Sequence, residues 1–217
     1  MKKLQNFING KLVDSTSGQT TTLINPATGQ AFATAPNSNA ADVDKAMTAA
    51  ANAFTQWRDA TPSERQRALL KIADALENRA DEIIAIESEN CGKPISVTMS
   101  EEIPPMVDQI RFFAGAARML EGKATAEYMA NMTSMIRREP VGVCAQVAPW
   151  NYPYLTAINS LVPALLAGNT VIMKHASQTL LCAERFSDAC AAAGFPEGVF
   201  QHVHASHASV ERMISDS

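Results

Sequence analysis

Several protein classes are excluded by what this sequence lacks. Its first residues, MKKLQNFINGKLVDSTSG, contain no apolar core of the kind that a signal peptide needs, and no apolar run is long enough to cross a bilayer. Lysine and arginine form no basic block and the net charge is −4, which gives no electrostatic footprint for nucleic acid. The four cysteines show no paired spacing, which favours reduced thiols. We therefore expect a cytoplasmic protein that binds neither nucleic acid nor a membrane.

The composition is that of an ordinary soluble globular protein. Of the 217 residues, 47% are hydrophobic and 18% are charged. A chain of this length can bury one good-sized core or two small ones.

The stretch 142–178 is the clearest structural signal. Residues 143–148 form a short apolar run between Gly142 and Pro149, which is typical of a buried parallel strand. Two prolines in Pro-Trp-Asn-Tyr-Pro then fix φ and remove backbone donors, so the chain must turn here. The fingerprint G-x-G-x-x-G does not follow this strand, so the usual dinucleotide-binding turn is missing.

A helix and a second strand follow this turn. Apolar residues recur at helical spacing over 155–166, and the residues from Thr170 to Lys174 are typical of a buried strand. Strand, helix and strand in about thirty residues predict a βαβ unit, whose ligands bind beyond the carboxyl ends of its strands. Those ends carry Trp150, Asn151 and Lys174, which are suited to recognition.

The rest of the chain predicts turns, helices and a strand-like insertion. Asn9-Gly10 predicts a hairpin at an edge of the structure. The segment between Gly122 and Pro140 is strand-like and has no partner strand of its own. Elsewhere we expect helices over 41–57, from Thr61-Pro62, over 80–90, from Pro104-Pro105, over 178–193 and over 208–215, with a third short strand over 198–203.

Several of these segments, taken in order, resemble one family. Ala-Pro-Trp-Asn-Tyr-Pro at 148–153, Pro-Ala-Leu-Leu-Ala-Gly-Asn at 163–169, and the lysine that closes the next strand look like the cofactor-binding domain of aldehyde dehydrogenases. Asn-Pro-Ala-Thr-Gly at 25–29 fits the same family, and the resemblance extends over the whole chain.

The resemblance implies an α/β fold with a partial Rossmann-like, doubly wound parallel sheet. It implies a hairpin and helical part over 1–122, a β-ribbon over 123–141, and the first half of the NAD(P)-binding sheet over 142–217, with the catalytic domain absent. The ribbon implies a homo-oligomer. A solvent-facing edge hairpin is the alternative for this segment.

Cofactor contacts are also implied. The backbone of Ala148, Pro149 and Trp150 would lie along the nicotinamide ribose, and Lys174 would donate to the adenosine ribose hydroxyls. Many NAD-preferring members carry a glutamate where this chain has Ser177, so NADP is expected to bind at least as well as NAD. Core packing for Trp150, a solvated strand end for Lys174 and a helix cap at Ser177 are the alternatives.

The resemblance gives Asn151 the role of oxyanion-hole donor in the oxidation of an aldehyde to a carboxylate, a contribution of about 3 kcal/mol. A hydrogen bond within the turn is its alternative role. The nucleophilic cysteine and the basic glutamate of the family find no match here, because Cys91, Cys144, Cys182 and Cys190 have the surroundings of core thiols. We therefore expect the chain to be inactive alone. A non-catalytic oligomerisation partner of a full-length enzyme is the alternative function.

The sequence leaves the substrate undecided and contains a group of histidines that resembles a metal site. The substrate signals conflict, since Asn90-Cys91-Gly92-Lys93-Pro94 resembles aminoaldehyde and betaine-aldehyde enzymes whereas Lys174-His175-Ala176-Ser177 resembles semialdehyde dehydrogenases. His202, His204 and His207 have metal-like spacing, but without acidic or cysteine support we expect no metal site.

Overall fold

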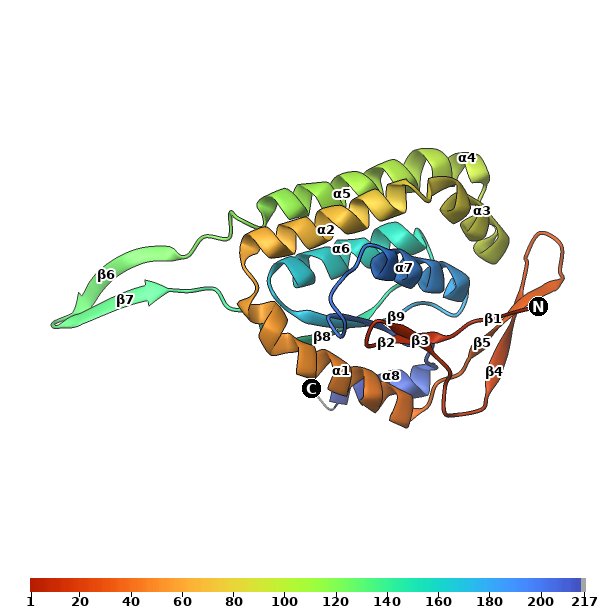
Figure 1. Ribbon diagram of the computed structural model, residues 1–217, viewed down its shortest axis with the longest axis horizontal. Coiled ribbons are helices and arrows are strands. Elements are labelled where there is room, and N and C mark those ends of the chain that lie inside the picture. The colour runs from red at the N-terminus through yellow and green to blue at the C-terminus, as the bar shows by residue number, and fades with distance from the viewer. Residues whose placement is uncertain (216–217) are drawn as a thin grey trace.

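The computed structural model describes residues 1–215, and its centre is a five-stranded sheet of order β3-β2-β10-β9-β8 (Figure 1). Three strands are parallel: β8 (Val143–Val147), β9 (Thr170–Lys174) and β10 (Phe200–His202). The other two, β2 (Asn6–Ile8) and β3 (Lys11–Val13), form the antiparallel hairpin predicted at Asn9-Gly10. The α/β fold and the parallel βαβ unit are confirmed.

The N-terminal hairpin extends the three parallel strands beyond β10. Strand β2 pairs antiparallel with β10, through His202 and Phe7, so the N-terminal hairpin covers that side of the sheet. Only β3 of the hairpin is an edge strand.

The predicted burial of the first strand of the βαβ unit was wrong. Among the described residues β8 pairs only with β9, and each of its residues is half-buried or exposed. Strand β9 lies between two strands and is buried at every position. The two apolar runs look alike in sequence. Their different burial therefore results from their positions in the sheet.

Helices cover both faces of this sheet (Figure 1). On one face lie α1 (Ala40–Asp59) and α8 (His207–Ser215). The other face is covered by α6 (Pro153–Leu166) and α7 (Leu180–Ala192). An outer layer then packs on α6 and α7: α2 (Pro62–Glu77), α3 (Ala80–Cys91), α4 (Ile95–Val97), the π-helical turn η1 (Thr98–Glu102) and α5 (Ile103–Ala116).

Capping residues set the helix boundaries. Asn39 caps α1 and Thr61 caps α2, each in a capping box with an acidic residue three positions later. Gly92, at φ 77°, ends α3 in the left-handed conformation that favours glycine. Each of the two N-terminal caps stabilises its helix by about 1 kcal/mol, and the one at Thr61 marked the start of α2 in the sequence.

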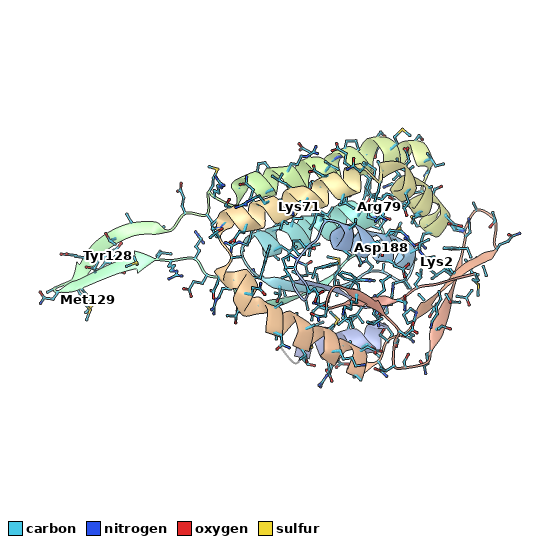
Figure 2. The ribbon with its side chains drawn as sticks, viewed as in Figure 1. Lys2, Lys71, Arg79, Tyr128, Met129 and Asp188 are labelled. Carbon is cyan, nitrogen blue, oxygen red and sulfur yellow. The ribbon has the colours of Figure 1, made fainter. Side chains whose placement is uncertain are left out.

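Two smaller β-structures extend from the body. Strands β1 (Lys2–Lys3), β5 (Ala31–Pro36) and β4 (Thr20–Ile24) form a three-stranded sheet. Strands β6 (Lys123–Met129) and β7 (Met132–Ile136) pair with each other in a ribbon that projects from the body, with Tyr128 and Met129 near its tip (Figure 2). The statement that this segment has no partner strand of its own was therefore wrong, because a turn with Asn131 at φ 62° lets its halves pair.

The main core lies between the sheet and the helices of the face that α6 and α7 cover. Its largest fully buried side chains include Tyr154, Phe186 and Phe200. No helix within residues 1–215 is both long and apolar enough to span a membrane.

Candidate functional site

The turn after β8 and the end of β9 lie side by side. Val147 is paired with Lys174 in the parallel register, and the Ala148 N–H donates to the Lys174 carbonyl at 2.9 Å. The chain then passes through Pro149 and Trp150 into α6. The sheet thus brings the predicted Trp-Asn corner and the predicted lysine to the same carboxyl edge, where parallel α/β sheets bind ligands.

The turn exposes its recognition side chains. Trp150 is 60% exposed, which excludes the core-packing alternative, and Asn151 is also exposed. Within residues 1–215 the Asn151 side-chain amide makes no hydrogen bond, whereas its backbone carbonyl accepts from Thr156. The alternative in which the Asn151 side chain bonds the turn was therefore wrong. Tyr152 has φ 52°, a strained backbone for a bulky residue, which the surroundings must hold in place.

A buried charge network provides that support. Glu102 Oε1 accepts the N–H groups of Tyr154 at 2.8 Å and Leu155 at 3.1 Å, which caps the start of α6. Lys93 Nζ forms ion pairs with Glu102 and, at 3.0 Å, with Glu87 Oε1. Both glutamates are 0% exposed.

The same lysine also contacts the turn directly. Lys93 Nζ lies 3.7 Å from the centroid of the Tyr152 ring, within range of a cation–π interaction. The Tyr152 hydroxyl donates to Glu101 at 2.7 Å. A cavity of about 240 Å³ lies against this assembly, lined by Trp150, Asn151 and Tyr152 from the turn and by Glu87, Cys91, Gly92 and Lys93 from the end of α3.

Burial and the neighbouring charges set the protonation of this network. Burial, together with the hydrogen bond and the charge of Glu102, raises the pKa of Glu87 to about 8, although Lys93 opposes the shift. Burial alone would lower the pKa of Lys93, but Glu102 and Glu87 outweigh it and raise that pKa. Glu87 therefore takes up a proton at a higher pH than an exposed glutamate does, and Lys93 favours its ionised form.

The end of β9, unlike the turn after β8, carries a buried lysine. Lys174 is 3% exposed, so the solvated-strand-end alternative was wrong, and burial lowers its pKa. No carboxylate of residues 1–215 lies within ion-pairing distance of it. A buried cation without a counter-ion costs stability, and an anionic or hydroxyl-rich ligand would offset that cost.

Ser177 lies in the exposed loop after β9. Its hydroxyl donates to the neighbouring Gln178 side chain at 3.2 Å, and it does not cap α7. Asn90 on α3 does so instead, because its Oδ1 accepts from Leu181 N–H at 2.9 Å and from Cys182 N–H at 3.3 Å. The helix-cap alternative for Ser177 was therefore wrong.

Three buried imidazoles lie behind Lys174. The His202 ring is 5.2 Å from that of His175 and 4.5 Å from that of His204, with edge-on geometry. Burial lowers the pKa of His175 to about 4 and that of His204 to about 3, and lowers that of His202 well below its usual value. His207 is exposed at the start of α8. The described part of the chain contains no cluster able to hold a metal ion.

None of the four cysteines has the surroundings of an activated nucleophile. Cys182 and Cys190 are buried on α7, whereas Cys91 and Cys144 are half-buried. Burial raises the pKa of all four thiols. A thiolate nucleophile needs the opposite shift.

The network of Glu87, Lys93 and Glu102 and the part of His175 in the imidazole cluster were not predicted from the sequence. One signal for the network was present: Glu87 follows Ile83 at helical spacing, which places a carboxylate on the apolar stripe of α3. An acidic residue at a buried position needs a cationic partner. Nothing local identified Lys93 as that partner.

Comparisons with known proteins agree with this architecture. The sequence profile of the aldehyde dehydrogenase family matches residues 12–217. A mitochondrial aldehyde dehydrogenase of Leishmania tarentolae is 39% identical over 193 residues, which are 89% of this chain and 39% of that protein. The DhaS protein of Bacillus subtilis (strain 168), described as an aldehyde dehydrogenase, is 40% identical over 200 residues, or 91% of this chain and 40% of that protein.

A solved structure extends the likeness to three dimensions. The crystal structure of PnpE in complex with nicotinamide adenine dinucleotide superposes with a TM-score of 0.90 at 35% identity, covering 94% of this chain and 42% of that one. The chain thus spans about two fifths of the length of the curated relatives that it matches. From the family profile and these identities, the chain belongs to the aldehyde dehydrogenase family.

Proposed function

We propose that this chain forms the NAD(P)-binding part of an enzyme that oxidises an aldehyde to a carboxylate. The family membership and the NAD bound by PnpE support the cofactor. The pairing of Val147 with Lys174, which brings the Trp150 turn and the lysine to one edge of the sheet, is the observation that carries the proposal. When bound, NAD(P) accepts a hydride from the substrate.

In this proposal the two sides of the edge hold different parts of the cofactor. The backbone of Ala148, Pro149 and Trp150 lies along the nicotinamide ribose. Lys174 donates to the adenosine ribose hydroxyls, and its burial without a counter-ion supports that role. Ser177 leaves the 2′ position free of negative charge, so NADP binds at least as well as NAD.

Asn151 is the proposed oxyanion donor. Its exposed amide, which makes no hydrogen bond within residues 1–215, is available to a substrate oxygen. The network of Glu87, Lys93 and Glu102 holds the turn rigidly from behind, and preorganisation of this kind makes an oxyanion donor effective.

The chain by itself is proposed to bind the cofactor without oxidising an aldehyde. The raised pKa of every one of its four thiols supports this, because each is protonated at neutral pH.

Titration of NADP and NAD into the chain, followed by the fluorescence of the exposed Trp150, tests the proposal. We expect saturable binding of both cofactors, with NADP at least as tight as NAD. Lys174→Gln should weaken both, whereas Lys71→Gln, a matched change at an exposed lysine of α2, should weaken neither. Absence of binding, or equal binding by both variants, contradicts the proposed cofactor site.

The ribbon favours a second role, as an oligomerisation element of a homo-oligomer. Large apolar side chains are exposed along both of its strands: Tyr128 at 83%, Met129 at 63%, Met132 at 59%, Met135 at 66% and Ile136 at 50%. Exposed apolar area of this kind marks interaction surfaces. If the chain acts only as a partner, light scattering will show it joining a full-length family member, and a Tyr128→Ser, Met135→Ser double variant will not join.

A further inference from the structure

A second site that the proposed function does not use lies where the ribbon joins the body. A cleft of about 640 Å³ is enclosed by the end of α1, the start of α2 and residues 137–141 after β7. Four guanidinium groups and two carboxylates line it, although the whole chain has a net charge of −4. These six are Arg58, Arg65, Arg137, Arg138, Asp59 and Glu139.

Two of the four arginines are neutralised by the two acids. Arg58 forms a bidentate pair with Asp59, at 2.8 Å from Nε and 3.1 Å from Nη2. Arg137 Nε lies 3.2 Å from a carboxylate oxygen of Glu139. The charges of the other two arginines are therefore in excess within the cleft.

Arg65 is the less accessible of these two. It is only 9% exposed, and none of its guanidinium nitrogens forms an ion pair with a carboxylate of residues 1–215. Its Nη1 donates to the carbonyls of Arg58 and Ala60 at the end of α1, which is the usual way for an arginine to stabilise a helix C-terminus. Its Nε is buried and finds no partner in the described part of the chain. Capping of α1 thus accounts for the hydrogen bonds of Nη1. It leaves Nε as a buried donor without an acceptor, which is rare in native proteins because it costs stability.

Arg138 belongs to the ribbon side of the cleft. Its Nε donates to the Glu121 carbonyl at 3.1 Å, and it forms no ion pair within residues 1–215. A guanidinium from the body and one from the base of the ribbon thus line the same cleft without a carboxylate on either.

We propose that this cleft binds a small molecule bearing a phosphate group, which Arg65 and Arg138 hold from opposite sides. Phosphate suits the site because its oxygens accept several N–H bonds in the planar arrangement that guanidinium offers. The cleft volume is within the range of small-molecule sites. The bound anion fixes the base of the ribbon against the body. This proposal does not depend on the chain's role in aldehyde oxidation.

Inorganic phosphate is the probe, titrated into the full chain at constant ionic strength maintained with sodium chloride. The readout is the Nε–H resonance of Arg65 in a nitrogen-15 correlation spectrum, together with the heat of binding. We expect a saturable shift of that resonance at millimolar phosphate. Arg138→Gln should weaken the affinity by about tenfold or more, because a hydrogen bond to a charged group contributes at least that much.

Two variants separate this site from other sources of the signal. Arg118→Gln removes an exposed arginine outside the cleft, whose Nη2 donates to Ser63 at 2.8 Å, and should leave the affinity unchanged. Lys174→Gln removes the proposed cofactor contact and should also leave the Arg65 signal unchanged. Because Arg65 supports α1, substitution at Arg138 is the decisive change. An Arg65 resonance that does not respond to phosphate, or equal weakening by Arg138→Gln and Arg118→Gln, overturns the proposal.

Discussion

The two halves of the candidate site reach the same edge of the sheet by opposite means. The turn after β8 leaves Trp150 and Asn151 exposed and is held from behind by ion pairs of Lys93 with Glu87 and Glu102. The end of β9 buries Lys174 beside three imidazoles and supplies no carboxylate among the described residues.

This difference shows how each half is positioned. Charges on the β8 side are paired inside the protein, so that half needs no ligand to satisfy them. On the β9 side the charge is buried and has no carboxylate partner within residues 1–215, so an acceptor that bound there would offset a cost in stability. Removing one partner should therefore cost folding stability on the first side, whereas on the second side it should mainly change ligand binding and pH dependence.

The largest effect is expected at Lys93. Lys93→Met leaves Glu87 and Glu102 buried without their cation, and we expect the free energy of unfolding to fall by about 3–5 kcal/mol. Urea unfolding followed by circular dichroism measures this loss. Lys71→Met, on the exposed face of α2, is the matched control and should change stability by less than about 0.5 kcal/mol. If Lys93→Met lowers the free energy of unfolding by less than about 1 kcal/mol, the two halves do not differ in how their charges contribute to stability.

The second effect is a pH dependence that belongs to the β9 side. Because the folded protein holds His202 neutral, only the unfolded chain takes up a proton there as the pH falls below about 6.5, and the folded state loses stability by up to about 1.4 kcal/mol per pH unit. The unfolding free energy of the wild type minus that of His202→Leu should therefore fall by about 2 kcal/mol from pH 6.5 to 4.5.

His207→Leu, at an exposed histidine on α8, is the control for that experiment. Glu87 and Glu184, whose pKa values burial raises, are present in both proteins, so their contributions cancel in the difference. A difference curve that is flat over this pH range would show that the buried cluster does take up protons.

A smaller effect is expected at Ser177. Ser177→Glu places a negative charge where we propose the 2′-phosphate, so NADP affinity should fall by about tenfold relative to NAD affinity. Fluorescence titration with both cofactors gives this ratio. Ser134→Glu, which adds the same charge on the distant ribbon strand β7, should leave the ratio unchanged. If the two variants behave alike, Ser177 does not face the cofactor.

The smallest effect on stability is expected at Asn151. Its side chain is exposed and makes no hydrogen bond within residues 1–215, so Asn151→Ala should change the unfolding free energy by less than about 0.5 kcal/mol. Thermal unfolding measures this change. A loss of more than about 1.5 kcal/mol would mean that the amide supports the turn and is not held free for a substrate.

Local sequence determined the elements of this protein because their causes are local. Apolar periodicity, two prolines, the capping residue Thr61 and Gly92 each act within a few residues, and they predicted the βαβ unit and most helix ends. The cap that Asn39 provides for α1 was not predicted. The resemblance to one family, which several short motifs in order carry, agreed with the family profile over residues 12–217 for the same reason.

Tertiary structure decided which strands pair and which side chains contact one another. The pairing of β2 with β10 joins segments that are distant in sequence. Strands β8 and β9 look alike in sequence, but within residues 1–215 β8 pairs only with β9. Lys93 meets both Glu87 and Glu102 because α3 and η1 pack together. The same holds for the imidazole cluster, since His175 follows β9 and His202 is the last residue of β10. No local pattern specifies such pairs, because burial and charge pairing depend on which elements pack together, and that choice minimises the free energy of the whole chain.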